Sequence, residues 1–270
     1  SKASSIDISN AAYIADSLNI HDNYDTESID FASLETVGGS FNLNTNRDLS
    51  TLNIDSLDNI DGQFYLSSNN NLEELSAPSL TVVEGNLQFN SNNGIEEVHF
   101  DNLTRIEGQL ILEYNNGISV LSMPVLTELD GRLYIYSNNS IETVDISSLT
   151  EIGSDVEIRY NNTLEYVLFT DLQTIHGSFQ MQDAHQVSTF DLPALLEVNG
   201  SFNLSNNSKV ESFSAPLLDD LSGSLTIRDN TDLASIDLTS LTCVSDYTIV
   251  GNDMDDDDTR DLLLHIISDC

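Results

Sequence analysis

Basic residues are scarce in this chain of 270 residues. Lysine and arginine together number eight, against 45 aspartate and glutamate residues, which gives a formal net charge of −37. Such a charge repels nucleic acid and anionic membrane surfaces, so neither is expected as a partner. Two interpretations of the acidity stay open. One is a solvated shell on an extended molecule; the other is adaptation to saline surroundings, where salt screens self-repulsion.

Long apolar runs and common catalytic motifs are also missing. No apolar stretch is long enough to span a bilayer, so we expect no direct membrane insertion. No nucleophile motif, glycine-rich phosphate loop or Cys-x-x-Cys pair occurs, and the five histidines lack the spacing of metal ligands. We therefore predict that the protein is not an enzyme. We also predict no cofactor, with calcium as the one alternative.

Cysteine is limited to Cys243 and Cys270. Cys243 lies in the last full repeat described below, and Cys270 ends the chain. We predict one disulfide between them that fastens the C-terminal end, as is typical of a secreted protein. A cytosolic protein would keep two thiols instead.

A period of 23 residues runs through nearly the whole chain. The glycines that mark it are Gly39, Gly62, Gly85, Gly108, Gly131, Gly177, Gly200 and Gly223. Ser154 breaks the series, with Gly153 beside it. A fixed period of this length indicates a quasi-linear array of repeated units.

Each unit, counted from its glycine as position 1, is apolar at positions 3, 5, 11, 14, 16, 19 and 22. Spacings of two are typical of strands, and no segment of the unit has helical periodicity. Each unit is thus predicted to be one coil of short strands and turns, stacked about 4.8 Å from the next. A single coil cannot bury enough apolar surface to fold alone.

Position 8 of the unit is asparagine in all coils except one. Its members are Asn46, Asn69, Asn92, Asn115, Asn138, Asn161, Asn207 and Asn230, with Ala184 as the exception. An asparagine side chain can satisfy backbone groups at a tight bend, and it tolerates the left-handed conformation. We expect a structural ladder of these side chains inside the turn.

The register divides the chain into three parts. Residues 1–15 are predicted to form an N-terminal cap, and 16–250 a single solenoid of about ten coils. Tyr247, Ile249 and Val250 should begin a last partial strand, of which Val250 alone keeps strict phase. The final part, 251–270, should be a C-terminal cap with a short amphipathic helix, because terminal coils need covers.

The frame L-x-x-[IV]-x-G-x-[LF]-x-[LI]-x-x-N resembles the receptor L-domain family, a leucine-rich-repeat-like group. The family includes the L domains of insulin and EGF receptors and fungal GPI-anchored proteins of cell-wall organisation. The segment from Leu126 to Asn138 carries the resemblance, which covers roughly residues 16–250. It implies an all-β solenoid, a right-handed β-helix, that acts at a cell surface without catalysis.

Outward positions 4 and 6 are the natural place for a binding site. Several large or basic side chains gather there or beside it in the middle coils: Tyr65, Ile111, Arg132, Tyr134, Tyr136 and Arg159. Tyrosine and arginine are over-represented at binding hot spots, and flat rings can stack on sugars. The alternative is that tyrosine simply suits a strand surface.

The acidic run near the C-terminus invites calcium, with Asp253, Asp255 and Asp257 as candidate ligands. Its spacing does not match an EF-hand, and the acids can equally open the terminal helix. Asn102 is the predicted glycosylation site, because its sequon faces outward. The sequons at Asn138 and Asn161 belong to the ladder and should stay unmodified.

A carbohydrate-active enzyme, a lyase or hydrolase built on a β-helix, is the alternative from another class. Such a site needs convergent carboxylates. Glu113 and Glu157 are two coils apart, and Asp219 and Asp220 are adjacent, so they point to opposite sides of a strand. We therefore favour a non-enzymatic scaffold, adhesion or ligand-binding module that is extracellular, on the cell surface or in the cell wall. Its partner would be an extracellular protein or a carbohydrate. A calcium-dependent adhesin is a further alternative.

Overall fold

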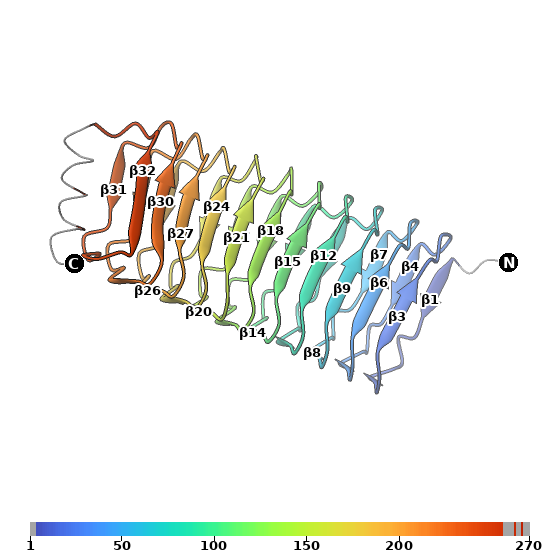
Figure 1. Ribbon diagram of the computed structural model, residues 1–270. Coiled ribbons are helices and arrows are strands. Elements are labelled where there is room, and N and C mark those ends of the chain that lie inside the picture. Colours follow the sequence, from blue (N-terminus) through green and yellow to red (C-terminus); the bar gives the residue numbers. More distant parts are fainter. Residues whose placement is uncertain (1–3, 256–261, 263–265, 267–270) are drawn as a thin grey trace.

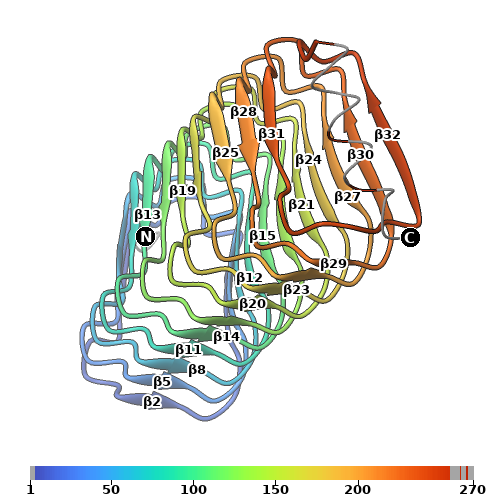
Figure 2. The same ribbon diagram turned by 90° about the vertical axis from the view of Figure 1, so that its left-hand side faces the viewer.

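The computed structural model describes residues 4–255, 262 and 266. Within this part the chain winds into a solenoid whose successive coils lie side by side, with the N-terminus at one end and the last strands at the other (Figure 1). Each coil passes through three flat faces, and each coil is slightly rotated against the one before it (Figure 2). The predicted all-β solenoid is confirmed.

Positions 3 to 6 form the longest sheet, because apolar side chains at 3 and 5 enter the core while 4 and 6 point outward. This eleven-stranded sheet has one strand per coil. Its strands are β3 (Leu18–His21), β6 (Phe41–Asn44), β9 (Phe64–Ser67), β12 (Leu87–Asn90), β15 (Leu110–Glu113), β18 (Leu133–Tyr136), β21 (Val156–Arg159), β24 (Phe179–Gln182), β27 (Phe202–Ser205), β30 (Ser224–Arg228) and β32 (Asp246–Val250).

The second face has strands of three residues and is divided into three sheets. The first contains β1 (Ser5–Asp7), β4 (Ser28–Asp30) and β7 (Thr51–Asn53). The second contains β10 (Glu74–Ser76), β13 (Glu97–His99), β16 (Val120–Ser122), β19 (Thr143–Asp145) and β22 (Tyr166–Leu168). The third contains β25 (Thr189–Asp191), β28 (Ser212–Ser214) and β31 (Ser235–Asp237).

The third face is a ten-stranded sheet of two-residue strands. They are β2 (Tyr13–Ile14), β5 (Thr36–Val37), β8 (Asn59–Ile60), β11 (Val82–Val83), β14 (Arg105–Ile106), β17 (Glu128–Leu129), β20 (Glu151–Ile152), β23 (Thr174–Ile175), β26 (Glu197–Val198) and β29 (Asp220–Leu221). In all three faces the strands pair in parallel, each with the strand one coil away. The core therefore runs along the axis of the solenoid as stacked rows of equivalent side chains.

The glycine at position 1 allows the coils to approach closely. A Cβ built on Gly131 would overlap the carbonyl oxygen of Gly108 in the preceding coil, and a Cβ on Gly153 would overlap that of Asp130. Gly153 thus has an equivalent close contact in the coil where Ser154 breaks the series.

The predicted asparagine ladder is present and fully buried. Asn115 is typical: its backbone N–H donates to Asn138 Oδ1 at 2.9 Å, and its Nδ2 donates to the carbonyl oxygen of Phe89 at 2.8 Å. One side chain therefore joins three consecutive coils. The left-handed residue of the turn is not the asparagine but the one before it, at position 7, with φ between 53° and 59° in ten coils.

The last coil has 22 residues, so the expectation that Val250 keeps phase is wrong. Leu225 pairs with Tyr247 and Ile227 with Ile249, which turns Val250 outward to 58% exposure. The same shift brings Asn252 under Asn230 and continues the ladder. The predicted cap helix within 251–270 falls largely outside the described residues. The boundary at residue 15 stays a prediction, although β1 and β2 already pair in register with the next coil.

Candidate functional site

The candidate binding residues lie on the outer surface of the eleven-stranded sheet, on β15, β18 and β21. In-register pairing places Ile111, Tyr134 and Glu157 in one row across these strands. It places Glu113, Tyr136 and Arg159 in the next row. Neighbours within a row are separated by the strand spacing of about 4.8 Å, which is close enough for long side chains to touch.

Four tyrosines pack around one another here and are called the tyrosine cluster: Tyr114, Tyr134, Tyr136 and Tyr160. Tyr136 is central. Its ring stacks on Tyr134 with centroids 5.7 Å apart and planes within 4°, and it meets Tyr114 and Tyr160 edge-on at 5.6 and 5.3 Å. Both arrangements are favourable for aromatic quadrupoles. The cluster is a preformed aromatic surface.

The left-handed turns contribute two of these rings. Tyr114 and Tyr160 occupy position 7, with φ of 55° and 57°, and their side chains are 50% and 36% exposed. A bulky residue at positive φ is uncommon, because Cβ approaches the following carbonyl oxygen. This backbone lets each turn ring reach back against Tyr136.

Two arginines hold the edges of the cluster. The Arg132 guanidinium lies 4.4 Å from the centroid of Tyr134, and that of Arg159 lies 5.4 Å from Tyr160. Both also pair with Glu157, at 3.7 and 3.8 Å. The charges therefore largely compensate each other locally, although the molecule as a whole is strongly acidic.

Burial raises the pKa of the Tyr134 phenol above its ordinary value of 10.0, and the carboxylates of Glu113 and Glu157 raise it further. The phenol thus stays protonated at physiological pH and can donate a hydrogen bond. A protonated phenol offers both a donor and an acceptor to a ligand.

The structure brings together only part of the predicted set. Arg132, Tyr134, Tyr136 and Arg159 belong to one contact network. Tyr65 is three strands from Tyr134, with Gln88 and Ile111 between them in register. Ile111 is only 6% exposed and adds little apolar surface.

Sequence reasoning did not assign Glu157 to this site. It pairs with both arginines, and the signal that could have found it is its position exactly one period after Tyr134. Its partner in the enzyme hypothesis, Glu113, accepts a hydrogen bond from Asn90 Nδ2 at 3.2 Å. The two carboxylates lie on β15 and β21, with β18 between them.

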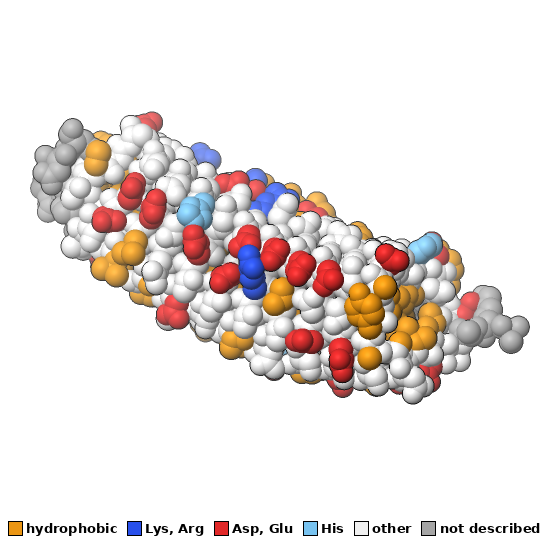
Figure 3. Space-filling view, turned by 90° about the horizontal axis from the view of Figure 1, so that it is seen from below, with side chains coloured by type: hydrophobic (Ala, Val, Ile, Leu, Met, Phe, Trp, Pro, Cys, Tyr) orange, Lys and Arg blue, Asp and Glu red, His pale blue; other side chains and the backbone are white. Residues whose placement is uncertain are grey.

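The surface of the ten-stranded sheet is acidic (Figure 3). Arg105 lies within it and is surrounded by carboxylates: Glu107 at 2.9 Å, Glu128 at 3.0 Å and Asp130 at 2.8 Å. The hydrogen bond with Asp130 raises the pKa of Arg105. This surface holds its one arginine entirely within its own ion pairs.

The remaining predicted sites have different outcomes. Among the described residues no three His, Cys, Asp or Glu side chains are arranged to hold a metal ion, and Asp257 lies outside them, so calcium stays a prediction. Cys270 also lies outside, so its disulfide with Cys243 stays a prediction. Asn102 is exposed, and its Nδ2 donates to the carbonyl oxygen of Pro78 at 2.6 Å, a bond that glycosylation would have to open.

The two ladder sequons are closed to modification, because Asn138 and Asn161 are completely buried and their amides are hydrogen-bonded. Over the described part of the chain, no helix is both long enough and apolar enough to cross a bilayer.

Comparisons with known proteins give little. No family model matches the chain, and no curated protein matches it. Among solved structures, the chain is similar to a leucine-rich repeat protein from Bacteroides ovatus ATCC 8483, at 14% sequence identity and a TM-score of 0.21. The match covers 90% of this chain and 85% of the other. The repeat-protein fold thus rests on the coils themselves.

Proposed function

We propose that this solenoid is a non-enzymatic, extracellular or cell-surface recognition module. Its tyrosine cluster would bind an extracellular protein or carbohydrate. The observation that carries the proposal is the four-ring arrangement around Tyr136, fixed at its edges by Arg132 and Arg159. A surface that is already ordered loses little side-chain entropy on binding.

The chemistry of the cluster supports recognition by contact more than by charge. Glu157 compensates both arginines, so a partner meets rings and phenol hydroxyls. Tyrosine and arginine are enriched at binding hot spots, where rigid amphipathic surfaces combine apolar contact with hydrogen bonding. The surrounding acidic surface would disfavour anionic competitors.

The extracellular location is supported by chain properties. A net charge of −37 disfavours nucleic acid and anionic membranes as partners, and two cysteines suffice for the disulfide predicted from the sequence. Mass spectrometry of native protein before and after reduction tests this part. A gain of two hydrogens on reduction supports it, and two free thiols in native protein contradict it.

Double substitution Tyr134→Ser and Tyr136→Ser tests the binding surface. Both side chains are outward-facing, so the fold should persist, as circular dichroism would verify. We expect affinity for a partner identified on extracellular-protein and glycan arrays to fall by about tenfold or more. Tyr166→Ser is the matched control, because Tyr166 is a strand tyrosine that is 56% exposed on another face. Equal affinity of the double variant and the wild type would remove the cluster from consideration.

The absence of catalysis is tested separately. Incubation with a panel of polysaccharides should release neither reducing ends nor unsaturated sugars. Release that disappears in Glu113→Gln or Glu157→Gln would instead establish the enzyme alternative.

A further inference from the structure

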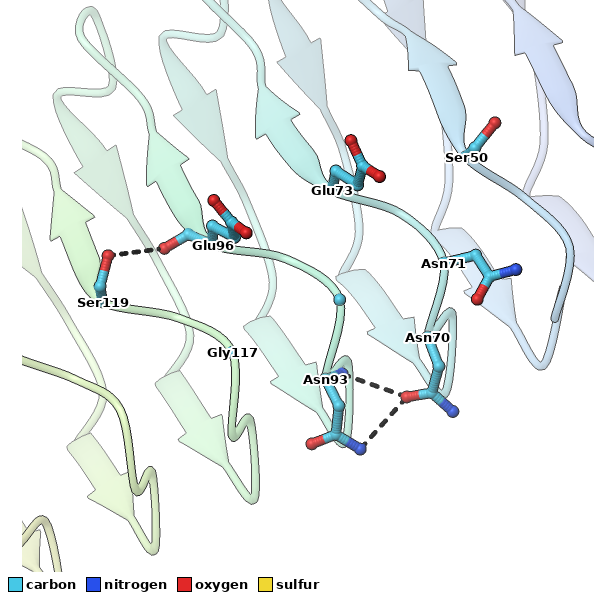
Figure 4. Close-up of a pocket in the computed structure, with 9 residues that line it drawn as sticks. Ser50, Asn70, Asn71, Glu73, Asn93, Glu96, Gly117 and Ser119 are labelled. Carbon is cyan, nitrogen blue, oxygen red and sulfur yellow. Dashed lines mark hydrogen bonds between the residues drawn. The ribbon is translucent and has the colours of Figure 1, made fainter.

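A polar hollow of about 640 Å³ lies at the corner between the eleven-stranded sheet and the second face. It extends over successive coils near β10 and β13 (Figure 4). Its walls consist of amide, carboxylate and hydroxyl side chains, chiefly Asn70, Asn71, Glu73, Asn93, Glu96 and Ser119. A volume of this size is typical of small-molecule sites.

Two glycines shape the hollow. Gly94 and Gly117 occupy position 10 in successive coils, between Asn71 and Ser140 in the flanking ones. A Cβ on either glycine would overlap a carbonyl oxygen of the preceding coil, Asn70 or Asn93, so the corner backbone lies directly against its neighbour. The indentation is therefore a property of the backbone itself.

The same two corners lack a turn hydrogen bond. In the flanking coil, Leu72 N–H donates to the carbonyl oxygen of Asn69 at 3.3 Å. In the described part of the chain, the equivalent N–H groups of Ile95 and Ile118 have no acceptor. Unpaired backbone donors at a hollow are rare in proteins and favour a bound polar partner.

The amides of the hollow are held in order by one another. Asn93 donates from both its backbone N–H and its Nδ2 to Asn70 Oδ1, at 3.1 and 3.2 Å. Asn116 repeats both bonds with Asn93 at 3.0 and 3.1 Å. Figure 4 shows this row beside Glu73 and Glu96, whose side chains project to the same side from adjacent coils.

The carboxylates keep their acceptor capacity. In the described chain neither Glu73 nor Glu96 forms an ion pair, and no lysine or arginine lines the hollow. Ser119 Oγ donates to the carbonyl oxygen of Glu96 at 3.0 Å, which fixes a third polar group in the row. Carboxylate acceptors beside amides match ligands with many hydroxyl groups, which both donate and accept.

We infer that this hollow binds a linear, uncharged oligosaccharide lying along the solenoid axis. The amide–carboxylate pair recurs with every coil, about 4.8 Å apart, which is close to the length of one sugar unit in an extended chain. Each coil would then contact about one sugar. The inference goes beyond the proposed function, because none of its lining residues belongs to the tyrosine cluster.

Calorimetric titration with hexasaccharides of glucose, xylose and mannose tests the inference. We expect at least one to bind the wild type. Glu73→Ala with Glu96→Ala should weaken its binding about tenfold or more, since each carboxylate loses charge-assisted hydrogen bonds. Glu142→Ala is the matched control: Glu142 has the same position in a later coil and does not line the hollow. It should bind as the wild type does.

Two further arms separate the alternatives. The tyrosine double variant should retain hexasaccharide binding in full; its loss there would assign the sugar to the tyrosine cluster and overturn this inference. A lysine oligomer, titrated at low and high salt, reports on binding by charge alone. The inference is wrong if only the lysine oligomer binds, if no hexasaccharide binds at millimolar concentration, or if the glutamate double variant binds as tightly as the wild type.

Discussion

At the scale of the residue, the most demanding position is 7, where ten non-glycine residues adopt the left-handed conformation. Aspartate, threonine, serine, tyrosine and asparagine all occur there, and only the last coil has a glycine, Gly251, with φ of 72°. Each non-glycine residue carries a conformational cost that glycine avoids. Ten small costs are therefore built into the turn.

Ser91→Gly should stabilise the protein by about 1 kcal/mol, because Ser91 has φ of 56° and makes no side-chain hydrogen bond in the described chain. Ser79→Gly is the control: Ser79 has no positive φ, and glycine there adds only flexibility to the unfolded state. Urea unfolding monitored by circular dichroism measures both. A loss of stability in Ser91→Gly would show that the left-handed backbone carries no cost here.

The choice of residue 7 was not predictable from the sequence. Residues at position 7 share no side-chain type, whereas position 8 is nearly invariant, and so the sequence drew attention to the asparagine. Its role as a buried ladder could be predicted because one polar residue type recurs at a fixed spacing. The conformation of its neighbour depends on how the ladder amide pulls the backbone round, which no pattern of residue types records.

At the scale of the element, the ladder has one defect. Ala184 donates its N–H to Asn207 Oδ1 but has no side-chain oxygen to offer, so the buried backbone N–H of Asn161 has no acceptor among the described residues. The same coil begins the third sheet of the second face, where β22 and β25 fail to pair. A hollow of about 370 Å³ lies at this break.

Ala184→Asn should complete the ladder and stabilise the protein by about 1 kcal/mol, the net value of a typical internal hydrogen bond. The reciprocal change, Asn115→Ala, should cost roughly 1–3 kcal/mol, because it leaves the Asn92 N–H buried without its acceptor. Chemical denaturation measures both. If the two variants shift stability in the same direction, the ladder does not contribute as described.

The strand assignment followed from periodicity, whereas the breaks between sheets did not. Positions 3, 5, 16 and 22 alternate with polar neighbours, which fixes inward and outward residues in every coil. Pairing between β7 and β10, or between β22 and β25, depends on small backbone displacements that leave this alternation unchanged. The 22-residue last coil escaped for a related reason, since a single deletion moves Tyr247 and Ile249 into phase without altering their spacing.

The candidate site was predictable at the level of strands but not of contacts. Position 4 and position 6 residues had to face outward, which located Tyr134 and Tyr136 correctly on one surface. The exclusion of Tyr65 follows from counting strands, and the recruitment of Glu157 follows from side-chain reach. Reach and ring orientation depend on rotamers, which the sequence does not specify.

At the scale of the whole molecule, net charge acts against the long stack of coils. Acidic side chains repeat along the ten-stranded face, and ion pairs with arginine relieve only a few of them. Self-repulsion therefore opposes folding, and salt should weaken it.

Raising sodium chloride from about 0.01 M to about 0.5 M shortens the screening length severalfold and should raise the Tm. Differential scanning calorimetry measures the shift. Matched sucrose solutions provide the control for general preferential exclusion. A Tm that falls with salt would show that favourable ion pairs, such as those of Arg105, outweigh repulsion.

The asparagine ladder also has a direction. Asn115 receives the acceptor for its backbone N–H from Asn138, which lies later in the chain, while its own amide reaches back to Phe89. During synthesis on the ribosome, the newest coil would therefore always carry a donor that only the following coil can satisfy. Growth of the stack from the N-terminus is thus completed one turn behind the emerging chain.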